Sequence, residues 1–237
     1  MLPAFSLIIP AFNEAERIGQ NLRDALSYLQ ANSPASELIV VNDGSADATS
    51  QIVREVFAEP GLIATRLFEQ SPNRGKGAAV RQGLLAATRP IGLFSDADFS
   101  TPIDETPKLI EPIAANEVDV AFGSRALNRR LIGNRQPWRR EQAGRVFNLI
   151  VRLATGLPFW DTQCGFKAFR LDVCHPILEA AQADGFGFDV ELLYLAQKAN
   201  LRMREIPVRW NHNEGSKLHV IYDSFRMFRE VVELRMR

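Results

Sequence analysis

The acidic residues Asp96 and Asp98 directly follow the apolar run 91–94, which is long enough for a buried strand. In an α/β sheet, ligands bind at the carboxyl ends of parallel strands, where this pair would stand. Two carboxylates this close repel each other unless a cation lies beside them. Mg²⁺ or Mn²⁺ suits that position, because such hard cations bind one or two carboxylates plus substrate phosphate oxygens. The pair therefore predicts a metal-assisted diphosphate site, with a polar turn as the competing interpretation.

Acidic residues also follow two other predicted strands. Glu14 comes just after the apolar run 5–9, and Asp43 stands at the end of the run 38–41. A single Asp-Gly turn is common and carries little information. Three acidic strand ends in one half of the chain carry more, because neighbouring strand ends converge on one ligand in α/β folds. We therefore expect these acids to share a site with Asp96 and Asp98.

Lys76 lies between two glycines at the predicted start of a helix. Backbone N–H groups at such a helix start are able to cradle a phosphate. Lys76 is not followed by Ser or Thr, and no Gly-x-Gly-x-x-Gly follows the first strand, which disfavours P-loop kinases and dinucleotide dehydrogenases. No Gly-x-Ser-x-Gly is present, and the three histidines lack metal-binding spacing. A phosphate site around Lys76 is the remaining expectation.

Arginines are concentrated between residues 125 and 145. This stretch holds seven arginines and a single acidic residue, Glu141, so its local charge is +6. Arginine suits phosphate recognition because its guanidinium binds phosphate in a bidentate manner. We expect an anionic phosphate partner here, with a solvated surface as the alternative. The arginines are Arg125, Arg129, Arg130, Arg135, Arg139, Arg140 and Arg145.

The composition limits the class of partner and the compartment. The chain has 237 residues, with 28 basic and 28 acidic side chains, so no overall field attracts nucleic acid. The two cysteines, Cys164 and Cys174, are too few for a disulfide framework or a metal quartet, which favours the cytoplasm. We expect no signal peptide, and no apolar run approaches the ~18 residues of a spanning helix. Any membrane association would therefore occur at the surface.

Strand and helix patterns alternate with short connections, which predicts an α/β fold with a Rossmann-like, mostly parallel central sheet flanked by helices. We expect one domain over residues 1–237, with a nucleotide-binding half (1–100) and an acceptor-binding half (101–237). Pro207 predicts an edge position for the last strand. The predicted strands are 5–9, 38–41, 66–69, 91–94, 118–122, 165–169 and 203–210. Five predicted helices have defined bounds: 15–30, 106–116, 141–155, 189–199 and 220–236. Three others are a helix capped by Asp47, a helix that passes through residues 80–85 and a helix capped by Asp172.

Seven short motifs resemble the family 2 glycosyltransferases, whose fold is GT-A. The general motifs are 7–14 (LIIPAFNE), 41–45 (VNDGS), 73–77 (NRGKG) and 96–98 (DAD). Three later motifs resemble the polyprenyl-phosphate hexosyltransferases of that family, the dolichyl-phosphate β-glucosyltransferase branch. These are 161–167 (DTQCGFK), 188–193 (FDVELL) and 214–217 (EGSK). The resemblance extends over nearly the whole chain and implies the GT-A fold.

The resemblance also implies roles for individual residues. Asp96 and Asp98 would bind the divalent metal, and Asp98 and Arg125 would be catalytic. Gln163 would lie near the donor sugar or the acceptor, and Lys217 would close over the donor. The full nucleotide-sugar set would be Pro10, Ala11, Phe12, Glu14, Asp43, Lys76, Asp96, Ala97, Gln163 and Lys217, and the acceptor phosphate would meet Arg125, Arg135 and Arg139.

The implied reaction is a metal-dependent, inverting transfer of a hexose onto a polyprenyl (dolichyl or undecaprenyl) phosphate, with UDP-glucose as the favoured donor. The cofactor would be Mg²⁺ or Mn²⁺, and the protein would act at the cytoplasmic face of a membrane as a peripheral enzyme. GDP-mannose is the alternative donor. A sugar-nucleotide pyrophosphorylase is disfavoured because no glycine-rich loop follows the first strand. Asp96, Asp98 and Arg125 argue against a non-catalytic phospholipid-binding module.

The predicted acceptor removes the need for a general base. Attack by a sugar hydroxyl requires a base, and no histidine suits that role. A phosphate monoester has a second pKa of about 6 and is already mostly dianionic at neutral pH.

The final predicted helix, 220–236, carries an apolar stripe flanked by arginines. It is either an ordinary packing helix or a helix that lies on the membrane surface.

Overall fold

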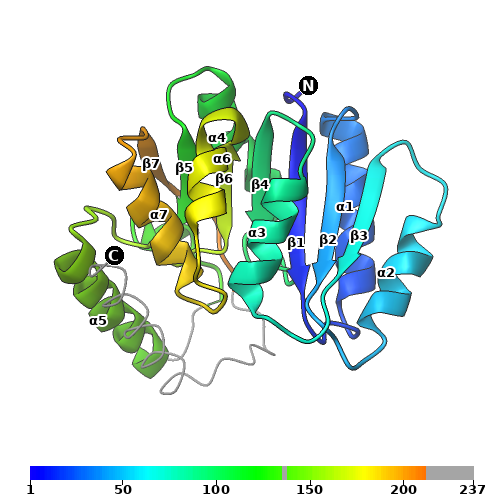
Figure 1. Ribbon diagram of the computed structural model, residues 1–237, viewed down its shortest axis with the longest axis horizontal. Helices are drawn as coiled ribbons and strands as arrows, with labels where there is room; N and C mark the ends of the chain where they lie inside the picture. Colours follow the sequence, from blue (N-terminus) through cyan, green and yellow to red (C-terminus); the bar gives the residue numbers. More distant parts are fainter. Residues whose placement is uncertain (135–137, 212–237) are drawn as a thin grey trace.

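The computed structural model describes residues 1–134 and 138–211, with the backbone alone at 138–141, 143, 145 and 147. The fold is built on one sheet whose strand order is β3-β2-β1-β4-β6-β5-β7 (Figure 1). The first half contributes β1 (Phe5–Ala11), α1 (Ile18–Asn32), β2 (Glu37–Asn42), α2 (Thr49–Phe57), β3 (Ala64–Glu69), α3 (Lys76–Ala86) and β4 (Ile91–Ser95). The second half contributes η1 (Ile103–Glu105), α4 (Thr106–Ala114), β5 (Val120–Ser124), η2 (Arg129–Leu131), α5 (Trp138–Thr155), β6 (Phe166–Arg170), α6 (Leu171–Ala180), α7 (Phe188–Lys198) and β7 (Met203–Pro207).

The sheet is mostly parallel, as predicted, with β6 reversed. Strand β1 pairs in parallel with β2 and β4, β2 with β3, and β5 with β7. Strand β6 runs antiparallel to both of its neighbours, β4 and β5. The turn that leads into β6 therefore reaches the same edge as the carboxyl ends of β4 and β5. Strand β7 is the last in the order, which confirms the edge position expected from Pro207.

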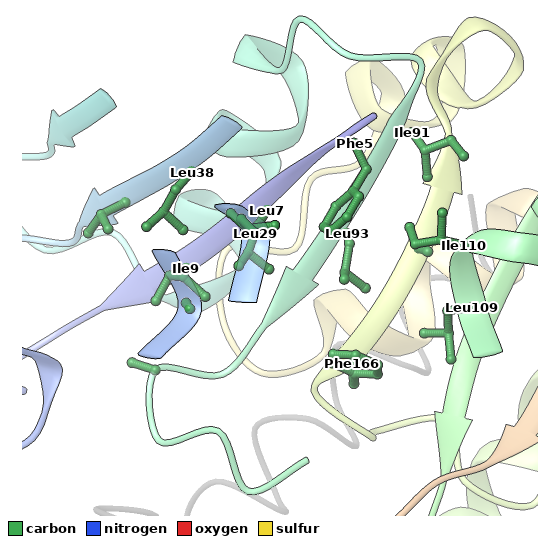
Figure 2. Packing of buried hydrophobic residues seen from close by; sticks show 14 of the residues in the cluster. Phe5, Leu7, Ile9, Leu29, Leu38, Ile91, Leu93, Leu109, Ile110 and Phe166 are labelled. Carbon is green, nitrogen blue, oxygen red and sulfur yellow. The ribbon is translucent and has the colours of Figure 1, made fainter. Parts of the chain in front are cut away.

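Helices cover both faces of the sheet, so the central strands β1, β2 and β4 are buried at every position rather than at alternate ones. Alternate residues of β1 enter two different cores: Leu7 and Ile9 pack on one face, and Ile8 packs on the other. The first core includes Leu29 of α1 and Leu109 and Ile110 of α4 (Figure 2). It also includes Val53 and Val56 of α2. The second core includes residues of α3, α6 and α7. This double burial fixes the strand ends at which polar residues gather.

The starts of two helices differ from the prediction, for different reasons. Helix α1 begins at Ile18 rather than at residue 15. The N–H groups of Asn13 and Glu14 instead donate to Ser45 Oγ (2.9 Å) and Thr49 Oγ1 (2.8 Å), which lie in and just after the turn that follows β2. Asp172 does not cap α6, because it lies inside the first turn of that helix.

Two further boundaries also differ. Helix α2 begins at Thr49 with Ala48, not Asp47, at its N-cap position, and Asp47 Oδ1 accepts from the N–H group of Thr49 (3.0 Å). Helix α5 begins at Trp138, three residues before the predicted start at 141. The predicted helix 220–236 lies outside the described residues.

Candidate active site

The acidic pair after β4 is held by groups from three different elements. The N–H group of Asp96 donates to Gly165 O (3.1 Å), just before β6, and Lys76 Nζ lies 2.5 Å from Asp96 Oδ1. Asp98 Oδ1 accepts from the N–H group of Ser100 (2.9 Å), and Arg17 Nη1 lies 4.0 Å from Asp98 Oδ2. Each carboxylate therefore has a cationic side chain beside it at the predicted edge of the sheet.

The donor set of this pair suits a hard divalent cation. Both side chains offer carboxylate oxygens, which Mg²⁺ and Mn²⁺ prefer. Within residues 1–134 and 138–211, no cluster of three or more His, Cys, Asp or Glu side chains forms a complete metal cage. A metal bound here would complete its coordination with water and the oxygens of a diphosphate, which is how Mg²⁺ is commonly bound beside phosphorylated substrates.

Lys76 is a fixed positive charge at this site. Burial disfavours its charged form, but the carboxylates of Asp96, Asp189 and Asp98 outweigh that effect and raise the pKa of Lys76 above its ordinary value. Its ammonium group also lies 5.8 Å from the centre of the Phe188 ring. Lys76 is therefore charged at neutral pH and available to meet a diphosphate beside the acidic pair.

The backbone around Lys76 does not form the phosphate cradle that its glycines predicted. The N–H groups of Gly77 and Ala78 both donate to Asp184 O, at 2.8 and 3.3 Å. A Cβ at Gly75 would lie 2.3 Å from that same carbonyl oxygen, so the glycine allows the loop before α7 to approach. The prediction was wrong because the helix start already binds a distant part of the chain. The Lys76 side chain remains as the phosphate candidate.

Asp43 organises the loop that leads into α3. Its carboxylate accepts from Asn73 Nδ2 (2.9 Å) and from the N–H groups of Arg74 (2.7 Å) and Gly75 (2.8 Å). This buried carboxylate thereby ties the end of β2 to the approach of Lys76. Contact between Asp43 and a nucleoside stays a prediction.

The other nucleotide-sugar candidates from the first half lie near the ends of β1 and β4. Pro10 and Ala11 are buried at the end of β1, whereas Phe12 leaves 41% of its surface exposed. Glu14 forms a two-pronged ion pair with Arg17, the arginine beside Asp98. Ala97 is buried, and its carbonyl oxygen accepts from Asn21 Nδ2 (2.7 Å). The edge thus presents one exposed aromatic ring beside a charged cluster.

Arg125 is held in one orientation by Asp161, a partner that the sequence interpretation did not assign. Its N–H, Nε and Nη2 groups donate to the Asp161 carboxylate at 2.9, 2.7 and 2.7 Å. The guanidinium carbon lies 5.7 Å from the centre of the Trp210 ring. Burial opposes ionisation, but Arg125 outweighs it and lowers the pKa of Asp161. The pair is therefore fully charged at neutral pH and lies where the turn before β6 meets the end of β5.

Two other acidic residues of the later motifs act in the interior. Lys167 and Asp189 form a fully buried ion pair, and Lys167 Nζ also donates to Cys164 O (2.6 Å). Glu191 Oε2 accepts from the N–H groups of Gln182 (3.0 Å) and Ala183 (2.6 Å). Glu191 therefore holds the loop that packs on the start of α3. The only signal for these roles in the sequence was the motif match.

Neither His175 nor Cys164 is suited to act as a general base at this edge. His175 lies in α6, after β6 has crossed to the opposite edge, and its Nδ1 is 3.6 Å from Glu179. Burial raises the pKa of the Cys164 thiol to about 12, so this thiol is protonated at neutral pH. His212 and His219 lie outside the described residues.

Some predicted site residues lie beyond the described part of the chain. Arg135 and Lys217 are outside the described residues, as is the side chain of Arg139. Gln163 is partly buried in the turn between Asp161 and β6. Among the helices that the structure describes, none is both long enough and apolar enough to cross a bilayer.

Gly165→Ala tests the close packing around the acidic pair. A Cβ at this position would lie 2.1 Å from Asp96 Oδ2, so the carboxylate would have to move. We expect kcat to fall by about 10- to 100-fold with little change in Tm, because displacements of about 1 Å in a catalytic group have effects of this size. Gly61→Ala is the control, since a Cβ there meets nothing within 4 Å. Equal activity of both variants would show that Asp96 need not hold this position.

Comparison with known proteins identifies the family of this chain. The family model described as Glycosyl transferase family 2 matches residues 6–178. The chain is 36% identical to "Dolichyl-phosphate beta-glucosyltransferase" of Drosophila melanogaster, and the match covers 98% of this chain and 74% of that protein. It is 34% identical to the protein of the same name in Saccharomyces cerevisiae, with the same coverage.

Solved structures show the same fold. Glucosyl-3-phosphoglycerate synthase from Mycobacterium tuberculosis, solved in complex with Mn²⁺, UDP and phosphoglyceric acid, matches with a TM-score of 0.68 at 19% identity. That match covers 98% of this chain and 77% of the synthase, and it confirms the GT-A fold. Because the family model covers most of the sequence and relatives above 30% identity align along almost all of it, the chain belongs to glycosyl transferase family 2.

Proposed function

We propose that this protein transfers glucose from UDP-glucose to a polyprenyl phosphate, with inversion at the anomeric carbon. One observation carries the proposal: a carboxylate pair suited to a metal diphosphate and an arginine fixed as a cation lie at the same edge of the sheet. Asp96 is close enough to Arg125 to favour the charged form of the guanidinium. The relatives named above, all dolichyl-phosphate β-glucosyltransferases, support this choice of sugar and acceptor.

The donor half of the site would bind the nucleoside diphosphate. Asp96 and Asp98 would hold Mg²⁺ or Mn²⁺, which supplies charge neutralisation for the diphosphate as it leaves. Lys76 would contribute a second positive charge beside Asp96, from which it lies 2.5 Å away. Phe12 offers an exposed ring near the end of β1 for the nucleoside, together with Pro10, Ala11, Glu14 and Asp43. Ala97, Gln163 and Lys217 complete the proposed donor set.

The acceptor half would position a phosphate rather than activate a hydroxyl. Two guanidinium nitrogens of Arg125 are bound to Asp161, so the arginine is oriented before any ligand arrives. A phosphate monoester, already mostly dianionic at neutral pH, attacks the anomeric carbon without giving a proton to the protein. The chain then has to align the two reactants and stabilise their charges. Arg135 and Arg139 are the further proposed contacts of the acceptor phosphate.

We also propose that the protein works peripherally on the cytoplasmic face of a membrane. Helix α5 exposes Val146, Leu149 and Leu153, which follow one another at helical spacing and leave 58%, 54% and 75% of their surface uncovered. Trp160 is 57% exposed nearby, with the guanidinium of Arg152 at 4.1 Å from its ring centre. An apolar stripe with adjacent cations is typical of a helix that lies on a lipid surface.

Liposome binding tests this orientation. We expect the double variant Leu149→Ser with Leu153→Ser to bind liposomes containing anionic lipid at least about 10-fold more weakly, because each lost apolar side chain is worth ~1.5–3 kcal/mol when buried. Binding of the wild type should also weaken as salt rises, because cations such as Arg152 contribute. Leu62→Ser is the matched control, since Leu62 is 77% exposed just before β3, at the other end of the sheet. Equal binding by all three proteins would exclude α5 as the contact.

A donor screen tests the proposed reaction. The purified chain is given a short polyprenyl phosphate, Mn²⁺ or Mg²⁺, and either UDP-glucose or GDP-mannose. We expect transfer from UDP-glucose in the presence of metal. Preferential transfer from GDP-mannose would replace the proposed donor. A separate reaction supplies a sugar 1-phosphate and a nucleoside triphosphate, and formation of a nucleotide sugar there would indicate a pyrophosphorylase. Lipid binding without turnover in any reaction would indicate a binding module.

A further inference from the structure

Glu205 lies in the edge strand β7 and binds three groups that surround the Arg125–Asp161 pair. Its Oε1 accepts from Ser124 Oγ (2.7 Å) and from the N–H group of Asp161 (2.8 Å). Its Oε2 accepts from the N–H group of Trp160 (2.9 Å). One carboxylate thus joins the residue before Arg125 to the turn that carries Asp161. Arg125 and Asp161 are 36 positions apart in the sequence.

We propose that Glu205 is a positioning residue that fixes the direction of the Arg125 guanidinium through Asp161. Asp161 determines where Arg125 points, because it binds both the backbone N–H group and two side-chain nitrogens of that arginine. Glu205 in turn determines where Asp161 stands, because its carboxylate accepts from the consecutive backbone N–H groups of Trp160 and Asp161. Ser124 completes the clamp from the β5 side.

The opposite side of the same turn is held by helix α5. Asn148 Nδ2 donates to Trp160 O (2.6 Å), and Asn148 Oδ1 accepts from Thr162 Oγ1 (3.2 Å). Without Glu205 the turn keeps these bonds, so the chain should still fold with Asp161 near the end of β5. What it loses are the bonds from Glu205 to Ser124 Oγ and to the N–H groups of Trp160 and Asp161, so the backbone that carries the Asp161 carboxylate is held less firmly against the end of β5. The role assigned to Glu205 is therefore one of alignment rather than of overall stability.

This inference rests on the proposed function, in which Arg125 meets the acceptor phosphate. The side chains proposed to bind the donor, such as Lys76 and Asp96, are positioned by other parts of the structure. These parts are the loop before α3 and the end of β4. Loss of Glu205 should therefore impair the use of the acceptor and leave donor binding unchanged. A residue with a purely structural role would not separate the two substrates in this way.

The experiment compares Glu205→Ala, Glu205→Gln and the control Arg204→Ala. Arg204 is the preceding residue of β7, and its side chain pairs with Glu117 on the surface (2.9 Å). We expect Glu205→Ala to lower kcat/KM for polyprenyl phosphate by about 10- to 100-fold, the range of effects for misplaced catalytic groups. Glu205→Gln should retain an intermediate activity, because its amide keeps one acceptor oxygen. The affinity of the Glu205 variants for UDP, measured by titration, should stay within about twofold of the wild type. The kcat/KM of the control variant should also stay within about twofold, since neither quantity involves the displaced groups.

Amide hydrogen exchange gives a readout that does not depend on activity. The amides of Trp160 and Asp161 should exchange faster in Glu205→Ala, while those of the neighbouring β5–β7 ladder keep their protection. The proposal is overturned if the acceptor kcat/KM of Glu205→Ala and Glu205→Gln equals that of Arg204→Ala, or if UDP binding falls in parallel with turnover. If Glu205→Ala does not fold, Glu205→Gln decides the outcome. A wild type that transfers no sugar to polyprenyl phosphate refutes the proposed function, and the exchange data still test the clamp.

Discussion

We expect Asp98→Asn to lower kcat by at least about 10²-fold, because metal neutralisation of a departing diphosphate is worth several kcal/mol. The substitution keeps the shape of the side chain and an oxygen able to accept from the N–H group of Ser100, which binds Asp98 at 2.9 Å. It removes one negative charge from the pair that is proposed to hold the metal. The fall should therefore come from lost charge rather than from a rearranged loop.

Asp24→Asn is the control for Asp98→Asn. Asp24 is an exposed carboxylate on α1 whose Oδ1 accepts from Gln20 Nε2 (2.8 Å). Its substitution should leave kcat unchanged, and both variants should melt within a few degrees of the wild type. Mn²⁺ binding in the presence of UDP, followed by water-proton relaxation, should weaken only in Asp98→Asn. Full activity of Asp98→Asn, or of the wild type in EDTA, would contradict the metal site.

We expect Arg125→Ala to lower kcat by about 10²- to 10³-fold, as is typical when one oriented donor to a developing or reacting anion is removed. It should also lower stability by about 3–5 kcal/mol, because Asp161 would remain buried without its charged partner. Arg125→Lys keeps the charge but cannot make the two-pronged contact. We therefore expect Arg125→Lys to recover stability more than activity.

Arg170→Ala separates the two effects of removing Arg125. Arg170 pairs with the buried carboxylate of Asp119 at 2.7 Å, and both residues lie at the opposite edge of the sheet. Its loss should reduce stability by less than the loss of Arg125, because Arg202 Nη2 still binds Asp119 Oδ1 (2.9 Å), while kcat stays near that of the wild type. If Arg125→Ala keeps full activity at a temperature where it is folded, or if Arg170→Ala loses as much activity, then Arg125 has no part in acceptor recognition.

Much of the acidic edge was predictable because it depends on local patterns. Apolar runs define buried strands, and the residues that follow them must lie at the carboxyl edge of a parallel sheet. Asp96, Asp98 and Asp43 were located in this way, and Lys76 was located by the glycines around it. The fold class followed from the alternation of strand and helix, and the order of β7 followed from Pro207.

Contacts between distant segments were not predictable from such patterns. The reversed strand β6 brings Asp161 and Gly165 to the edge, and no local signal shows which way a short apolar run will pair. The backbone around Lys76 was misinterpreted for the same reason, because Asp184 O, more than 100 residues away, occupies the N–H groups of the helix start. The start of α1 shifted because side chains after β2 bind the backbone before the helix.

In the proposed reaction, a lipid phosphate attacks the sugar without the help of a protein base. The most direct test offers the wild-type chain UDP-glucose and Mn²⁺ with either a polyprenyl phosphate or the free polyprenol of the same length. The lipid product is extracted, and its anomeric configuration is determined by NMR. We expect a β-linked glucosyl phosphate from the first acceptor and no product from the second. Efficient transfer to the free alcohol with the phosphate inert, or an α-linked product, would contradict it.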